Sequence, residues 1–102
     1  MDIVGEVRET VAAILAGSVA SYSDVGQRIG AGARQAGRAM SLLGEGVPWW
    51  RMVRADGSPA TCHGGRAPRL LLAEGTPMHG ARVDMRRARY RWEPARPSWS
   101  RA

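Results

Sequence analysis

The chain has 102 residues, of which 44% are hydrophobic, which is enough for one small domain with a modest core. It contains one cysteine, Cys62, which excludes an internal disulfide and a cysteine-rich zinc site. The net charge is +6, and the basic residues apart from two histidines are all arginines. The densest apolar run, Leu70 to Ala73, is far too short to span a membrane, so we expect a soluble cytoplasmic protein.

The positive charge is concentrated in the second half of the sequence. Residues 1–47 carry four arginines and five acidic residues, whereas residues 48–102 carry eleven arginines and four acidic residues. Basic charge gathered in one half is typical of proteins that bind a polyanion, with nucleic acid as the first candidate. A genome rich in G and C would explain arginine in place of lysine, but not the cluster between Arg82 and Arg91.

Two helices are predicted at the start of the chain. Apolar residues recur at helical spacing over residues 2–16, and Gly17 is a usual helix stop. Ser21 and Asp24 resemble a capping box, which predicts a second helix at residues 22–29.

A third helix is predicted at residues 33–43, after a glycine-rich turn at residues 30–32. Its buried stripe is predicted to comprise Ala33, Ala36, Met40 and Leu43. Another face carries Arg34, Arg38 and Ser41, three or four residues apart. Two short helices, the second with an arginine face, make a candidate helix-turn-helix that reads DNA. The alternative for the two arginines is a solvated helix face without a ligand.

A β-hairpin is predicted next, because Asp56-Gly57 is a strong hairpin signal beside a short strand at residues 52–54. Such a hairpin would be the wing of a winged helix-turn-helix domain. We therefore expect a mainly α fold with a small β wing over residues 1–92.

The rest of the chain carries weaker signals. A helix is predicted to start at Pro68 and to stop at Gly75. Val83 and Met85 alternate with charged neighbours, which indicates a short strand or turn. Residues 93–102 are predicted to be a mobile tail.

Four stretches resemble, in the same order, segments of the O6-alkylguanine-DNA alkyltransferases. Residues 19–25 are similar to the entry of their helix-turn-helix, and residues 32–40 to their recognition helix. Residues 47–53, Val-Pro-Trp-Trp-Arg-Met-Val, resemble their Pro-Cys-His-Arg-Val active-site motif. Residues 72–75 resemble the segment that supplies their buried glutamate. The loop at residues 58–68 matches least well.

The departures from that motif decide the function that the resemblance implies. The family's nucleophilic cysteine aligns with Trp49 and its proton-relaying histidine with Trp50, so Glu74 has no base to orient. An indole offers no nucleophile comparable to a thiolate. The pattern is similar to alkyltransferase-like proteins, which bind O6-alkylguanine in DNA without repairing it and hand it to nucleotide excision repair. The resemblance thus implies no catalytic residue, no cofactor and no metal, and most such proteins have Trp-His where this chain has Trp-Trp.

The resemblance also implies a lesion pocket. Trp49 would wall it where the thiol stands in the repair enzymes, with Trp50 and Tyr22 beside it. Tyr22 aligns with the tyrosine near the 3′ phosphate of the flipped nucleotide, which helps to rotate the nucleotide outward. For Trp50 the alternative is simple packing under the wing.

The expected DNA-binding residues are Tyr22, Arg34, Arg38, Ser41 and Arg51. Arg34 aligns with the arginine that enters the base stack and fills the space left by the flipped nucleotide. Arg51 has an equally good alternative as a structural hydrogen-bond donor. The implied partners are double-stranded DNA with O6-alkylguanine and nucleotide excision repair proteins, bound by a monomer near the nucleoid.

Two other functions remain open from the sequence. A winged-helix transcription regulator would explain the helix pair and the charge, but not residues 48–53. A true alkyltransferase would have to use Cys62, with His63 beside it; on an extended segment these two side chains would point to opposite faces. Cys62, His63 and His79 are too few and too scattered for a closed zinc site.

Overall fold

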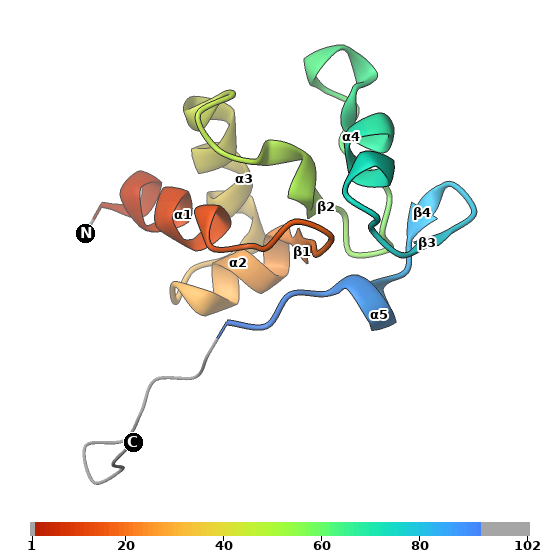
Figure 1. The fold of residues 1–102 in the computed structure, drawn as a ribbon. Coiled ribbons are helices and arrows are strands. Elements are labelled where there is room, and N and C mark those ends of the chain that lie inside the picture. The colour runs from red at the N-terminus through yellow and green to blue at the C-terminus, as the bar shows by residue number, and fades with distance from the viewer. Residues whose placement is uncertain (1, 93–102) are drawn as a thin grey trace, which may run out of the picture.

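The computed structural model describes residues 2–92, and the predicted tail at residues 93–102 lies outside the described residues. The described part is mainly helical, with two small two-stranded sheets (Figure 1). Three helices pack together around the larger apolar core, namely α1 (Ile3–Ala12), α2 (Tyr22–Arg28) and α3 (Ala33–Leu43). None of the helices in this part of the chain is long and apolar enough to cross a membrane.

The predicted capping box starts α2. Ser21 Oγ accepts a hydrogen bond from the backbone N–H of Asp24 at 3.1 Å, and Asp24 Oδ2 accepts one from the N–H of Ser21 at 3.0 Å. Gly26 then lets α2 approach the turn into α3, since a Cβ there would lie 2.7 Å from the carbonyl of Gly32. The helices predicted at residues 22–29 and 33–43 are thus confirmed to within one residue.

The first helix is shorter than predicted. It ends at Ala12 and not near Gly17, because the backbone tightens after it, with the N–H of Ile14 donating to Val11 at 3.0 Å. The side chain of Ile14 enters the core beyond the helix end.

The buried stripe of α3 also differs from the prediction. Its buried members are Ala36, Ala39 and Met40. Ala33 is exposed, since it begins the first turn of α3 next to the exposed Gly32. The prediction that Ala33 is buried is therefore wrong.

A short parallel pairing joins the start of α2 to the tryptophan pair. Strand β1 (Ala20–Ser21) pairs with β2 (Met52–Val53), with Ala20 opposite Met52. β1 directly precedes α2, and β2 directly follows the 3-10 helix η1 (Trp49–Arg51). The pairing therefore fixes Trp49 relative to Tyr22.

The wing lies later in the chain than predicted. The remaining elements are η2 (His63–Gly65), α4 (Ala67–Ala73), β3 (Met78–His79), β4 (Arg82–Val83) and α5 (Met85–Ala88). The antiparallel ribbon consists of β3 and β4 and not of residues 52–58. The turn at Asp56-Gly57 does form, but only a single bridge follows, between Val53 and Pro59. Pro59 has no N–H with which to extend a ladder.

The segment after α5 returns towards α1 and α2 (Figure 1). The N–H of Tyr90 donates to the carbonyl of Val19 at 2.7 Å, and Trp92 Nε1 donates to the carbonyl of Thr10 at 3.0 Å. Arg89 pairs with Asp24 at 2.6 Å. This segment thereby holds the start of α2 from the outside.

A second, smaller core lies under α4, α5 and the wing. It consists of Val19, Val53, Leu71, Val83 and Ala88.

Candidate functional site

A cavity of about 330 Å³ opens between α2, α3, the start of the loop after α3, η1 and η2. Its walls are mostly apolar. They are formed by Tyr22, Gly37, Met40, Ser41, Gly44, Trp49, Ala60, Cys62 and His63. Two of the three predicted pocket residues, Tyr22 and Trp49, are thus brought together here.

Tyr22 is held at the rim of the cavity by the start of α2. It is the first residue after the Ser21 cap, and its ring lies against Gly37 of α3, where a Cβ would be 3.7 Å away. Burial raises the pKa of Tyr22 above its ordinary value, the thiolate form of Cys62 adds to the rise, and the guanidinium of Arg54 opposes it. Tyr22 therefore stays neutral at pH 7 and keeps its hydroxyl proton available for donation.

Trp49 forms the inner wall of the cavity. Its side chain belongs to η1 and is only 4% exposed, so it is a fixed part of the core. The ring of His63 stacks on it with centroids 4.0 Å apart and planes 22° apart, and Trp50 meets it edge-on at 5.8 Å. The guanidinium of Arg66 lies 5.6 Å from the ring centroid. These neighbours leave part of the indole to face the cavity.

His63 is a wall residue that the sequence did not indicate. Its backbone has φ of +54°, a left-handed conformation that turns the chain and aims both Cys62 and His63 at the cavity. The expectation that these two side chains point to opposite faces is therefore wrong. Glu45 lies behind His63, with an Oε2–Nδ1 distance of 4.0 Å, and pairs with Arg66 at 2.8 Å.

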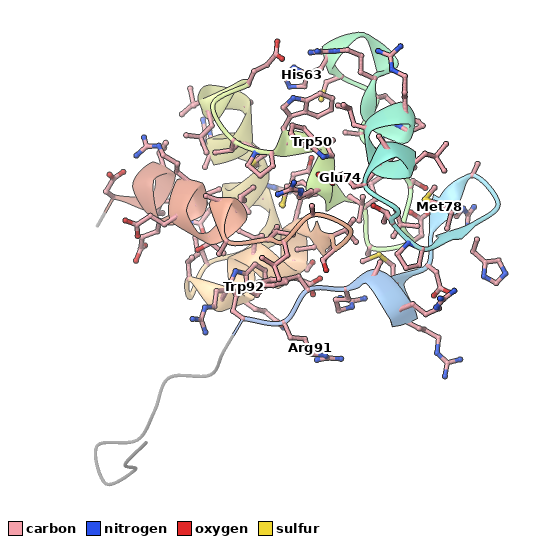
Figure 2. All side chains as sticks on the ribbon, viewed as in Figure 1. Trp50, His63, Glu74, Met78, Arg91 and Trp92 are labelled. Carbon is pink, nitrogen blue, oxygen red and sulfur yellow. The ribbon has the colours of Figure 1, made fainter. Side chains whose placement is uncertain are left out.

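Trp50 and Arg51 do not line the cavity, and their contacts fit the alternatives that the sequence left open, packing for Trp50 and structural hydrogen bonding for Arg51. Trp50 Nε1 donates to Glu74 Oε1 at 3.0 Å, and Arg51 pairs with the same carboxylate through Nε and Nη2. Arg51 Nη1 donates to the carbonyl of Ile14 at 2.8 Å. In Figure 2, Trp50 lies between His63 and Glu74 in the middle of the molecule. The carboxylate of Glu74 thus holds both side chains inside the molecule, Trp50 away from the cavity lining and Arg51 away from the DNA-binding role predicted for it.

The predicted DNA-binding residues of α3 lie on its outer face. Arg34 and Arg38 are exposed, and neither pairs with a carboxylate among residues 2–92. Ser41 Oγ donates to the carbonyl of Arg38 at 2.7 Å, and Ser41 also lines the cavity. Ser41 therefore links the exposed face of α3 to the cavity, whereas Arg38 lines a separate hollow beside Ile3 and Val4 of α1.

The basic cluster of the second half divides into two sets. Arg89 is held by Asp24, as described above. The exposed members are Arg82, Arg86, Arg87 and Arg91. Within residues 2–92 there is no group of three or more His, Cys, Asp or Glu side chains suited to a metal ion.

The family described as 6-O-methylguanine DNA methyltransferase, DNA binding domain, matches residues 2–76 of the sequence. The chain belongs to this family. The match spans α1 to α4, and with them the cavity and both tryptophans of η1. No curated protein sequence gives a significant match to the chain.

Two solved structures of the family's fold are similar over nearly the whole chain. S. pombe Atl1, in complex with damaged DNA containing O6-carboxymethylguanine, is 25% identical, with a TM-score of 0.75. S. pombe ATL, in complex with DNA, is also 25% identical, with a TM-score of 0.76. Each similarity covers 92% of this chain and 98% of the other. They confirm the predicted resemblance to alkyltransferase-like proteins and the winged helix-turn-helix fold class.

Proposed function

We propose that this protein binds O6-alkylguanine in double-stranded DNA, holds the flipped base in the cavity beside Trp49, and leaves the alkyl group in place. The observation that carries the proposal is that Trp49 is a wall of that cavity, at the position where the sequence motif of the repair enzymes has its nucleophilic cysteine. The DNA-bound S. pombe proteins with the same fold support it.

The size and lining of the cavity fit one alkylated base. A volume of about 330 Å³ is at the lower end of small-molecule sites, which suits a single base and not a larger ligand. The mostly apolar wall removes an alkyl group from water, which stabilises the complex by about 25 cal/mol per Å² of apolar surface. Flipping costs a few kcal/mol, and less for a base that already pairs poorly, as O6-alkylguanine does.

The polar groups around the cavity suit entry from a DNA duplex. Tyr22 at the rim would meet the phosphate of the flipped nucleotide, and Arg34 at the start of α3 would fill the space left in the stack. Ser41 continues the exposed face of α3 to the lining of the cavity. A winged-helix regulator would need that face but not a base-sized cavity behind it, so the regulator is the weaker reading.

The indole at Trp49 supports binding without repair. Alkyl transfer needs a nucleophile next to a base, and the indole is not such a nucleophile. The side chain that follows it, Trp50, donates to Glu74 and has no proton-accepting nitrogen. We infer that the protein instead flags the lesion for nucleotide excision repair and binds it as a monomer.

A second candidate function rests on one observation, that Cys62 lines the same cavity. In that case Cys62 would take the alkyl group, and the protein would be an alkyltransferase with a displaced nucleophile. Cys62 is a free and exposed thiol, and no hydrogen bond from its sulfur to a base is present in the described part of the chain. Lesion binding without transfer is therefore the stronger proposal.

The test is a titration of two duplexes, identical except for one O6-methylguanine, at physiological salt. We expect tighter binding to the lesion duplex, with the methyl group still on the DNA and the protein mass unchanged afterwards. Equal affinity for the two duplexes would overturn the proposal. A protein heavier by one methyl group, with the gain absent from Cys62→Ser, would establish the alkyltransferase.

A further inference from the structure

A second, smaller cavity of about 130 Å³ adjoins the base-sized cavity. The two share Tyr22, Ala60 and Cys62, so they meet on the same side of the molecule. The smaller one adds a charged residue, Arg54, which directly follows β2. Arg54 lies just past the family motif at residues 47–53.

Arg54 is carried by a tight and well-bonded turn. Its N–H donates to the carbonyl of Ser58 at 3.1 Å, and its carbonyl accepts from the N–H of Gly57 at 2.8 Å. Asp56 Oδ1 accepts from the N–H of Ser58 at 2.9 Å, which closes an Asx turn. The backbone under Arg54 is therefore held on both sides.

The same turn is docked on the wing. Gly57 has φ of +89°, and a Cβ there would lie 2.3 Å from the carbonyl oxygen of Val83. The N–H of Val83 donates to the carbonyl of Gly57 at 2.9 Å. Because only glycine permits this contact, the turn has one position relative to β4. The backbone of Arg54 thus has one position beside the two cavities, from which its side chain extends.

The charge of Arg54 is free for a ligand. Its side chain is exposed, and it forms no ion pair in the described range. The acidic group on the same turn is Asp56, whose Oδ1 already accepts a hydrogen bond from Ser58. That bond lowers the pKa of Asp56, and the charges of Arg82 and Arg54 lower it further. The guanidinium also acts on Tyr22, whose pKa it lowers against the larger effect of burial.

We propose that Arg54 binds the phosphate of the nucleotide that is turned into the base-sized cavity, next to Tyr22. A guanidinium offers two parallel donors that match phosphate oxygens. Turning a base out rotates its backbone phosphate, so a donor fixed beside the cavity mouth stabilises the flipped state and not the stacked one. This assignment rests on the proposed function, since it needs a flipped nucleotide.

The test combines Arg54→Gln with DNA in which one phosphate carries no charge. Wild-type protein and variant would be titrated with the O6-methylguanine duplex and with duplexes whose linkage 5′ or 3′ to the lesion is a methylphosphonate. We expect Arg54→Gln to bind the unmodified lesion duplex about tenfold more weakly than wild type does. We expect one of the two methylphosphonates to weaken binding of the wild-type protein by a similar factor. Together they should cost little more than either alone, because both remove the same contact.

Arg8→Gln is the matched control, since Arg8 is an exposed arginine of α1, which lines neither cavity. Its losses should be small and should add to those of either methylphosphonate. Arg54→Lys keeps the charge without the two parallel donors, and we expect an intermediate loss. Circular dichroism would establish that each variant is folded.

If the loss from Arg54→Gln added to the loss from the methylphosphonate at both linkages, Arg54 would not bind either phosphate. If the wild-type protein still preferred the lesion duplex in that case, the proposed function would stand. Equal affinity of the wild-type protein for damaged and undamaged DNA would overturn the proposed function, and the role of Arg54 with it.

Discussion

Trp50 donates its indole N–H to Glu74, the same carboxylate that pairs with Arg51. Glu74 is therefore engaged by two side chains of η1, the indole of Trp50 and the guanidinium of Arg51. The three side chains join η1 to the end of α4, and Arg51 reaches on to the carbonyl of Ile14. A residue pair that the family motif associates with chemistry here supports the wall behind Trp49.

Replacing Glu74 with glutamine should therefore lower stability. Glutamine can still accept from Trp50, but the nearly buried guanidinium of Arg51 loses its counter-charge. We expect a fall of about 3 kcal/mol in the free energy of unfolding, the size usual when one partner of a buried pair is removed. Urea unfolding at pH 7 measures it. Glu45→Gln is the control, since Glu45 is exposed and its pair with Arg66 should contribute under about 1 kcal/mol. Equal losses in the two variants would contradict the prediction.

The loss of stability in Glu74→Gln should also depend on pH. The hydrogen bond from Arg51 lowers the pKa of Glu74, burial opposes this, and the bond from Trp50 lowers the pKa further. The pKa of a glutamate in the unfolded chain is about 4.3. Because the pKa of Glu74 is lower in the folded state, its ionised carboxylate stabilises the fold in full at pH values above that unfolded pKa. That stability is lost as the pH falls through the folded value. The stability gap between wild type and Glu74→Gln should thus be constant from pH 7 to about pH 5 and narrow below pH 4. A gap unchanged down to pH 3 would be inconsistent with the Arg51 pairing.

Trp49→Cys restores the family's nucleophile but should not restore methyl transfer. Trp50 still stands where the family has its histidine, so the family's base is missing; His63, which stacks on Trp49, has only Glu45 at 4.0 Å to orient it. Incubation with O6-methylguanine DNA and measurement of the protein mass test this. The paired variant Trp49→Cys with Trp50→His supplies the base and is the positive comparison. Because loss of the buried indole costs about 3–5 kcal/mol, folding of each variant must be established by circular dichroism. A methyl adduct on the single variant would contradict the prediction.

The helix pair could be predicted because its signals are local. Ser21 and Asp24 cap α2, and Gly30 and Gly44 end α2 and α3, so nothing distant is needed to place them. The position of Tyr22 at the start of α2 followed directly.

The cavity wall could not be predicted in the same way. Trp50 turns inward because of Glu74, which lies 24 residues away, and His63 faces the cavity because of a left-handed backbone in the loop that matched the family least. The prediction put the wing at residues 52–58 because a turn signal does not reveal which strands pair beside it. The turn at Asp56-Gly57 packs on β4 and does not join two strands of a ladder. Gly80-Ala81, the two residues between the paired His79 and Arg82, was the local turn signal that marked the actual ribbon, with glycine at the first central position.

Gly26→Ala should lower the stability of the protein, because it pushes α2 away from the turn that leads into α3. A methyl group at position 26 would meet the carbonyl of Gly32 at 2.7 Å, and backbone cannot move aside as a side chain can. We expect a loss of about 2 kcal/mol in the free energy of unfolding, as for other overpacked sites. Gly32→Ala is the matched control, because nothing lies within 4 Å of a Cβ there and its φ is −99°. Similar losses in both variants would mean that the close approach of α2 to the turn is not limiting.

Arg34→Ala should separate lesion binding from general DNA binding. If Arg34 fills the space of a flipped base, its loss removes a contact made only in the flipped state, worth about 1–3 kcal/mol for stacking. Lesion affinity should then fall about tenfold, and affinity for undamaged duplex only about two- to threefold, because there Arg34 supplies at most a screened phosphate contact. Titrations of both duplexes measure the two losses, and Arg8→Ala, which removes the same charge from α1, sets the baseline. Equal losses for the two duplexes would reduce Arg34 to a phosphate contact, and the flipped base would then need another residue to fill its place.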